Sequence, residues 1–246
     1  MIKLVILWTK VIVLALIALL FSSCNGNVEF GNGIDGNGNV KTENRTPAEK
    51  FTKIENSRGL ALTVEQSSAI SVEVEADENL LKHIIIKVDN GTLVVTTDED
   101  MDDYTTRKVT VKMPVIEKLS VDSGASIATV NTLTGASLKL HSDSGSELIV
   151  KAEYDAIDAD CSSGSLQKLS GKSLKLTLQA DSGSNLEAKK LLSNAVIATS
   201  SSGSSVSVHP LVSLNANASS GASIDYVNEP KTIKKDESSG GSINKS

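Results

Sequence analysis

The sequence predicts an all-β protein, a parallel β-helix or β-solenoid with about 20 residues per coil, and three observations support this fold class. A Ser-Gly dipeptide recurs seven times after Leu119, aliphatic residues alternate with polar ones on both sides of it, and aromatic residues make up only 3% of the chain. Self-similarity at a fixed period near 20 residues is the mark of a repeat architecture. A core of small aliphatic side chains suits stacked repeats better than a globular sandwich.

The Ser-Gly dipeptides are predicted to be the corners of successive coils. Their glycines stand at positions 124, 145, 164, 183, 203, 221 and 240, which are 21, 19, 19, 20, 18 and 19 residues apart. Glycine accepts a positive φ at no steric cost, and serine or aspartate side chains bond nearby backbone groups in a turn. A repeat of this length has no room for a strand and a full helix with their loops. Each repeat is therefore expected to be one coil, paired with the next at a spacing of ~4.8 Å.

Three aliphatic columns flank the corners and are predicted to point inward, because β side chains alternate between the two faces of a strand. Seven residues before the glycine lie Leu138, Ile157, Leu176, Val196, Leu214 and Ile233, with Glu117 as the exception. Five residues before it lie Leu119, Leu140, Ala159, Leu178, Ala198 and Ala216, with Lys235 as the exception. Three residues after it lie Ile127, Leu148, Leu186, Val206, Ile224 and Ile243, with Gln167 as the exception. Pro230 and the segment 231–235 interrupt the pattern and are expected to blunt the open sheet edge at this end.

The region before the repeat is strand-like but less regular. Val109 and Val111 alternate with polar residues, and an Asn-Gly turn signal stands at Asn90. Asn-Gly repetition near the N-terminus is typical of a flexible tether. The predicted organisation is a signal peptide at 1–23, a tether at 24–38 and a solenoid at 39–246, divided into N-terminal strands at 39–114 and repeat coils at 115–246.

The N-terminus is predicted to be a targeting segment. Lys3 and Lys10 precede or flank an unbroken apolar run at 11–21, which is too short to span a bilayer and long enough for a signal-peptide core. The run ends in Phe-Ser-Ser-Cys24, which resembles a lipobox, with Phe21 where Leu is usual. This resemblance implies cleavage before Cys24 and acylation of that cysteine, which gives stable membrane anchoring. The alternative is an ordinary secretory signal with Cys24 incidental.

Composition excludes two other classes of protein. The formal net charge is −6 and no basic run is present, so nucleic-acid binding is not expected. Once the signal peptide is cut, Cys24 and Cys161 are the remaining cysteines, so lipidation of Cys24 leaves no disulfide framework. Cys161 aligns with small residues in the other repeats and is predicted to be a buried small residue rather than a nucleophile.

The most site-like feature is a ladder of corner residues, for which two interpretations stay open. A stacked strip of hydroxyls and carboxylates would suit a glycan or an envelope-protein partner, whereas the same residues also simply make the corner, coil after coil. The ladder consists of Asp122, Ser123, Asp143, Ser144, Ser163, Asp181, Ser182, Ser202, Ser220 and Ser239. We predict no catalytic residue, metal site or cofactor. The acidic run at 98–103 lacks the spacing of an EF-hand and is expected to be a solvated hairpin loop.

The order of several short segments resembles the head GIN domain family, described as auto-transporter adhesins and common in Bacteroidota. The segments that carry the resemblance are 36–40, 51–54, 74–80 and 90–95, followed by the Ser-Gly corners, Tyr226, Pro230 and 238–242. The resemblance covers roughly residues 36 to 246 and implies an exported β-solenoid, with no catalytic positions to carry over.

The predicted function is that of a non-enzymatic, lipid-anchored cell-envelope protein with a structural, adhesive or scaffolding role. Its expected location is the outer membrane, facing the periplasm or the cell surface. One alternative is a carbohydrate-active β-helix enzyme, although Asp122 and Asp143 on successive coils stand too close together for either glycosidase geometry. The other alternative is an envelope-stress or regulatory accessory protein.

Overall fold

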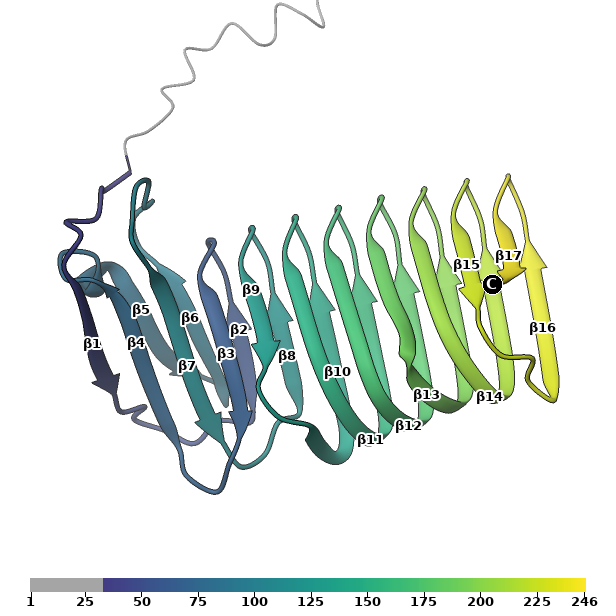
Figure 1. Cartoon of the computed structure of the whole chain (residues 1–246), viewed down its shortest axis with the longest axis horizontal. Coiled ribbons are helices and arrows are strands. Elements are labelled where there is room, and N and C mark those ends of the chain that lie inside the picture. The colour runs from purple at the N-terminus through teal and green to yellow at the C-terminus, as the bar shows by residue number, and fades with distance from the viewer. Residues whose placement is uncertain (1–32) are drawn as a thin grey trace, which may run out of the picture. The chain divides into compact units, whose positions relative to one another are not determined.

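The computed structural model describes residues 33–246, of which Ile34–Ser246 form one compact unit. The predicted signal peptide and Cys24 lie outside the described residues, and the predicted domain boundaries stay a prediction. The unit is an all-β solenoid of about 7 turns with ~19 residues per turn, which confirms the predicted fold class (Figure 1).

The first part of the compact unit forms short strands and one 3₁₀ turn. These are β1 (Val40–Arg45), β2 (Lys53–Asn56), β3 (Ala61–Gln66), β4 (Ser71–Asp77), η1 (Leu81–His83), β5 (Ile84–Asp89), β6 (Thr92–Thr97) and β7 (Arg107–Met113). The repeat region follows with β8 (Lys118–Val121), β9 (Ser126–Thr129), β10 (Leu133–Ser142), β11 (Glu147–Cys161), β12 (Leu166–Ala180), β13 (Asn185–Ser200), β14 (Ser205–Ala218), β15 (Ser223–Tyr226), β16 (Thr232–Glu237) and β17 (Ser242–Lys245).

Each coil of the repeat region consists of a strand, a Ser-Gly corner and a second strand. Long strands such as β11 and β12 bend at the edge opposite the corners, so one strand serves both sides of the solenoid (Figure 1). Successive coils pair in parallel and keep the same register on the strand that leads into each corner, as Ala159 opposite Leu178 and Leu178 opposite Ala198 illustrate. Bulges shift the register elsewhere between β12 and β13 and between β13 and β14. The inward columns are therefore continuous, and the core fills the space between the two sides.

The core confirms the predicted inward columns over most of their length. Leu140, Leu178 and Leu186 are buried, and so is Gln167, whose amide nitrogen donates to Ser142 Oγ at 3.0 Å and to the Asp160 carbonyl at 2.5 Å. Ile233 departs from the prediction, because its side chain is 37% exposed. It belongs to β16, the last strand on its side, and no further coil covers it.

The N-terminal coils are stacked out of chain order. The coil β2–β3 lies between β6–β7 and β8–β9, since Lys53 pairs with Thr92 on one side and with Lys118 on the other. In the same way, β3 pairs with both β7 and β9. Beyond β6 and β7 the stack ends in antiparallel strands: β5 pairs with β6, β4 pairs with β7, and β1 pairs with the other side of β4. The connection from β7 to β8 therefore passes the β2–β3 coil.

Candidate functional site

The seven predicted corners share one backbone geometry. Ser182 has φ 52° and Gly183 φ 71°, and the amide of Ser184 donates to the Asp181 carbonyl at 3.1 Å. Positive φ at both central residues defines a type I′ turn. Serine therefore adopts the left-handed conformation along with glycine, which the sequence interpretation had assigned to glycine alone.

The corners are joined into one ladder along a single edge of the solenoid (Figure 1). The amide of Gly164 donates to the carbonyl of Ser182 at 3.1 Å, and the amide of Gly183 donates to that of Ser202 at 3.1 Å. The same bond links each corner to the next, beginning with an additional corner at Arg58-Gly59. Because the Ser-Gly signal is missing at Arg58, the repeat pattern did not reveal this corner.

The predicted site residues lie in this ladder. All the corner serines are exposed, whereas Asp143 is half-buried. The Asp143 carboxylate accepts the backbone amide of Ser144 at 2.6 Å. Hydrogen bonds from the side chains of Ser163 and Ser162, opposed by burial, hold the pKa of Asp143 below its usual range. That carboxylate is thus partly engaged in the corners, and a ligand-binding role for the ladder stays a prediction.

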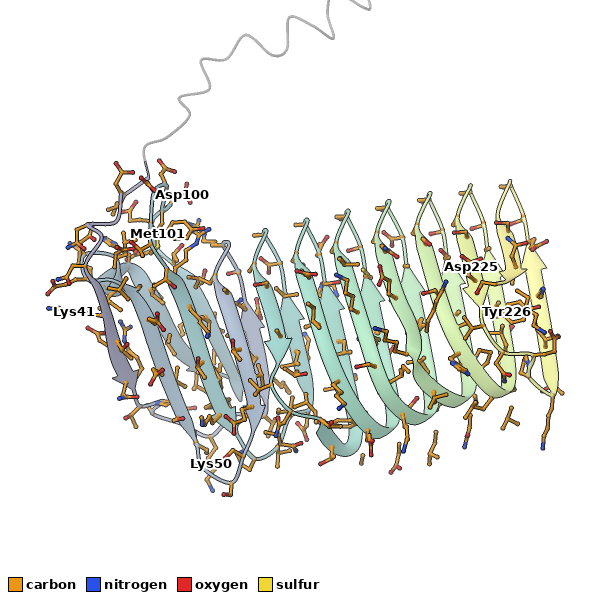
Figure 2. The ribbon with its side chains drawn as sticks, viewed as in Figure 1. Lys41, Lys50, Asp100, Met101, Asp225 and Tyr226 are labelled. Atoms are coloured by element: carbon orange, nitrogen blue, oxygen red, sulfur yellow. The ribbon has the colours of Figure 1, made fainter. Side chains whose placement is uncertain are left out.

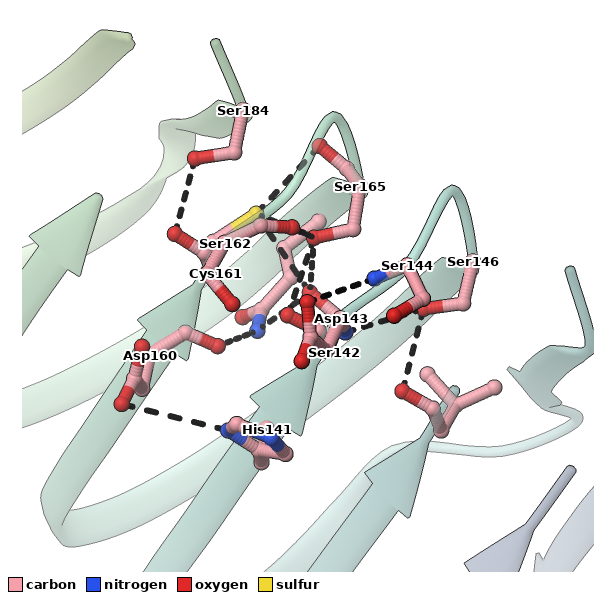
Figure 3. Close-up of polar contacts among 12 residues, drawn as sticks. His141, Ser142, Asp143, Ser144, Ser146, Asp160, Cys161, Ser162, Ser165 and Ser184 are labelled. Carbon is pink, nitrogen blue, oxygen red and sulfur yellow. Dashed lines mark hydrogen bonds and ion pairs between the residues drawn. The ribbon is translucent and has the colours of Figure 1, made fainter. Parts of the chain in front are cut away.

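A second, buried row of serines lies directly beneath the corners (Figure 3). Ser165 Oγ donates to the Ser142 carbonyl at 2.9 Å, and Ser184 Oγ donates to the Cys161 carbonyl at 2.7 Å. The same bond recurs from Ser146 to Val121 and from Ser204 to Ala180. This row follows each corner glycine by one position, where the repeat always has a small residue, so the aligned sequence contained the signal. Each serine ties its coil to the preceding one.

Cys161 is part of this buried layer, as predicted. Its thiol accepts a hydrogen bond from Ser142 Oγ at 3.3 Å and lies 3.2 Å from Ser165 Oγ. His141 Nδ1 lies 3.9 Å from Asp160 Oδ2, and both side chains are on the outer face (Figure 3). Because consecutive β residues point to opposite faces, Cys161 is separated from His141 by the sheet and cannot use it as a base.

The acidic run lies in the connection between β6 and β7 (Figure 2). Its carboxylates are exposed, and Asp98 and Asp100 contact His83 at 3.0 Å and Arg58 at 3.6 Å. Met101, which directly follows Asp100, is buried and pairs with Ile34. Among residues 33–246, no group of three or more His, Cys, Asp or Glu side chains is arranged to hold a metal ion.

A groove that the sequence interpretation missed lies where the β7–β8 connection passes the β2–β3 coil. It has a volume of about 720 Å³ and is lined by Lys53, Glu55, Val115, Ile116, Glu117, Lys118, Ser120, Thr134, Gly135, Ser137, Lys139 and Tyr154, among others. Lys53, Lys118 and Lys139 stand side by side on three neighbouring strands. We call this feature the lysine groove. Lys53 belongs to the coil stacked out of order, so the repeat alignment could not place it beside the other two.

The fold and the corner ladder define a repeat-built β-solenoid protein, each coil closed by a type I′ turn. The chain belongs to the family described as "Putative auto-transporter adhesin, head GIN domain", whose sequence model matches residues 50–230. No functionally curated protein matches the sequence. Among residues 33–246, no helix is long and apolar enough to span a membrane.

Three solved structures illustrate the likeness. A "putative adhesin" from Bacteroides fragilis is 20% identical and has a TM-score of 0.82, with 87% of this chain and 100% of that chain covered. A "putative lipid binding protein" from Parabacteroides distasonis is 19% identical, with a TM-score of 0.73 and coverage of 87% and 99%. A "putative adhesin" from Parabacteroides merdae is 20% identical, with a TM-score of 0.72 and coverage of 87% and 98%. At these identities the likeness concerns the fold.

Proposed function

We propose that this protein is a non-enzymatic, lipid-anchored adhesin of the cell envelope, whose solenoid presents binding surfaces to partners outside the membrane. The observation that carries the proposal is the parallel stacking of the coils, which places equivalent outward side chains in columns along the strands that lead into the corners. A surface built from such columns suits an extended ligand, because each further coil repeats the same contacts. The family description as an adhesin agrees with this use.

The anchor in this proposal is Cys24. Acyl chains on one cysteine would fix the chain to the membrane, and the part of the Asn-Gly segment that precedes Ile34, where the compact unit begins, would hold the solenoid away from it. Such an anchor leaves both sides of the solenoid and the corner ladder accessible. The proposed location is the outer membrane.

The proposal is tested in cells that produce the full-length protein. Labelled palmitate should enter the wild-type protein and the Cys161→Ala variant, but not the Cys24→Ala variant. Cells with the wild-type protein should adhere to surfaces coated with mucin, collagen or polygalacturonate better than cells with Cys24→Ala. Protease treatment of intact cells should cut the solenoid only if it faces outward.

Two results would contradict the proposal. If the Cys24→Ala variant were labelled as strongly as the wild type, Cys24 would not be the acylated residue. If cells with the wild-type protein and cells with Cys24→Ala adhered equally, the anchored protein would not be an adhesin. Release of reducing ends from a polysaccharide panel, abolished by Asp122→Ala or Asp143→Ala, would instead establish the carbohydrate-active enzyme.

A further inference from the structure

We propose that the lysine groove binds an acidic polysaccharide, a linear glycan with carboxylate, sulfate or phosphate groups along its length. This inference rests on the proposed adhesive function and names the ligand class of one surface. The groove is distinct from the corner ladder, because it lies on the outer face of β2, β8 and β10 and on the β7–β8 connection.

The first argument is the alignment of three like charges. Lys53 pairs with Lys118, and Lys118 pairs with Lys139, so the three side chains leave the same face at steps of ~4.8 Å. Like charges directly opposite each other on neighbouring strands are destabilising. Within the described part of the chain, none of these ammonium groups makes a hydrogen bond or an ion pair within 4 Å. The arrangement therefore favours a negative ligand.

Lys112 and Lys168, by contrast, have carboxylate partners on a neighbouring coil. Lys112 Nζ lies 2.9 Å from Glu65 Oε2, and Lys168 Nζ lies 3.1 Å from Glu147 Oε1. The groove does contain two carboxylates, Glu55 and Glu117, and the second accepts the Thr52 hydroxyl at 2.7 Å. Three lysines outnumber them on a chain whose net charge is −6, so the groove differs in charge from the molecule as a whole.

The second argument is the shape of the groove. Its volume of about 720 Å³ falls in the range of pockets that bind small ligands, ~300–1,000 Å³. Tyr154 holds the β7–β8 connection in place on one side of the groove, because its hydroxyl donates to the Ile116 carbonyl at 2.9 Å. A side chain at Gly135 would lie 2.5 Å from the Tyr154 ring, so glycine is needed for this packing. The groove is thus a preformed surface.

The third argument concerns the kind of anion. Three charges in a straight line span ~10 Å across two strand steps, which fits a ligand with successive charges better than one compact ion. Hydroxyls of Ser120, Thr134 and Ser137 also line the groove. Ser120 is buried and Thr134 Oγ1 donates to Gln66 Oε1 at 3.3 Å, so the exposed Ser137 is the hydroxyl best placed to hydrogen-bond a sugar hydroxyl as donor and acceptor. A glycan uses both features, whereas an acidic peptide uses chiefly the charges.

The test compares two variants of the full-length protein purified in detergent. In the first, Lys53, Lys118 and Lys139 are changed to Gln; in the charge-matched control, the exposed residues Lys87, Lys151 and Lys175 are changed to Gln. Binding to polygalacturonate, dextran sulfate, neutral dextran and poly-glutamate is measured at two salt concentrations. Thermal unfolding followed by circular dichroism checks that both variants fold, and we expect no loss of stability in the first, since it relieves repulsion.

The wild type and the control should bind the charged polysaccharides, more weakly at high salt, and the groove variant should bind them about tenfold more weakly. Equal loss in the control, tight binding of neutral dextran, or equally tight binding of poly-glutamate would overturn the inference. Wild-type protein that binds neither charged polysaccharide would also overturn it. If cells with that protein still adhere better than Cys24→Ala cells, the adhesive function stands and only the groove assignment fails.

Discussion

At the scale of single residues, the corners require glycine because of its backbone conformation and not because a side chain there would clash. A Cβ atom built on Gly183 meets nothing within 4 Å, yet φ at this residue is +71°. Gly171 differs, because it combines φ +115° with a Cβ position 2.1 Å from the Ala152 carbonyl oxygen. The repeated glycine is thus required for its left-handed conformation, while Gly171 is required for close approach as well.

The corner predicts the effect of replacing Gly183. A Gly183→Val variant should lose stability, because the left-handed region costs an L-residue ~1–2 kcal/mol and a β-branched side chain is accommodated there least well. A Gly183→Asn variant should lose less, since asparagine visits this region. The midpoint of urea unfolding measures both. Equal stability of the Val and Asn variants would show that the corner has another geometry.

At the scale of the coil, the buried serines beneath the corners hold neighbouring coils together. Each one donates a hydrogen bond to a carbonyl of the preceding coil, at a position that water does not reach. The backbone hydrogen bonds between parallel strands already join the same coils. The serine bond adds a side-chain link that holds each corner to the preceding coil. The serines thereby satisfy polar groups inside a thin aliphatic core.

Replacing one of these serines should be measurable. A Ser184→Ala variant should lose about 0.5–1.5 kcal/mol of unfolding free energy, the net contribution of a typical hydrogen bond. Ser126→Ala in β9 is the control, because that side chain makes no hydrogen bond in the described part of the chain and a surface change of this kind shifts stability by less than ~0.5 kcal/mol. Chemical denaturation of both variants gives the comparison. If both variants lost the same unfolding free energy, the Ser184 hydrogen bond would not be what stabilises the contact between these coils.

Sequence periodicity predicted the coil and its inward columns, because both depend on local spacing. The order of the coils could not be predicted, since nothing in the pattern around Lys53 or Thr92 says which coils are neighbours. The lysine groove was missed for that reason, whereas the additional corner at Arg58 was missed because it lacks the Ser-Gly signal. The corner ladder was predicted residue by residue, but the engagement of Asp143 by neighbouring serines depends on side-chain geometry between coils.

At the scale of the whole solenoid, the two ends are the places where stacking must stop. β16, the last strand on its side of the solenoid, is exposed along its length, and no further strand covers Ile233 on it. Two inward columns change to charged residues in this final coil: Lys235 stands where Ala216 and Leu178 precede it, and Glu237 stands in the column of Ala218. Inward-pointing charges of this kind discourage another chain from adding to an open edge.

Lys235 is held in place over the end of the core. Its ammonium group lies 4.6 Å from the centre of the Tyr226 ring and donates to the Ile243 carbonyl at 3.2 Å, while Glu237 Oε1 accepts the Ile243 amide at 2.5 Å.

A Lys235→Leu variant would extend the apolar column to the open edge without the charge. We therefore expect association that increases with protein concentration, measured by size-exclusion chromatography with light scattering. Lys234→Leu, on the outward column of the same strand, adds the same side chain and should associate less. Two outcomes would contradict this prediction: both variants have the same mass in solution as the wild type, or Lys234→Leu associates as strongly as Lys235→Leu. Either outcome would show that the charge at Lys235 does not prevent association at this end of the solenoid.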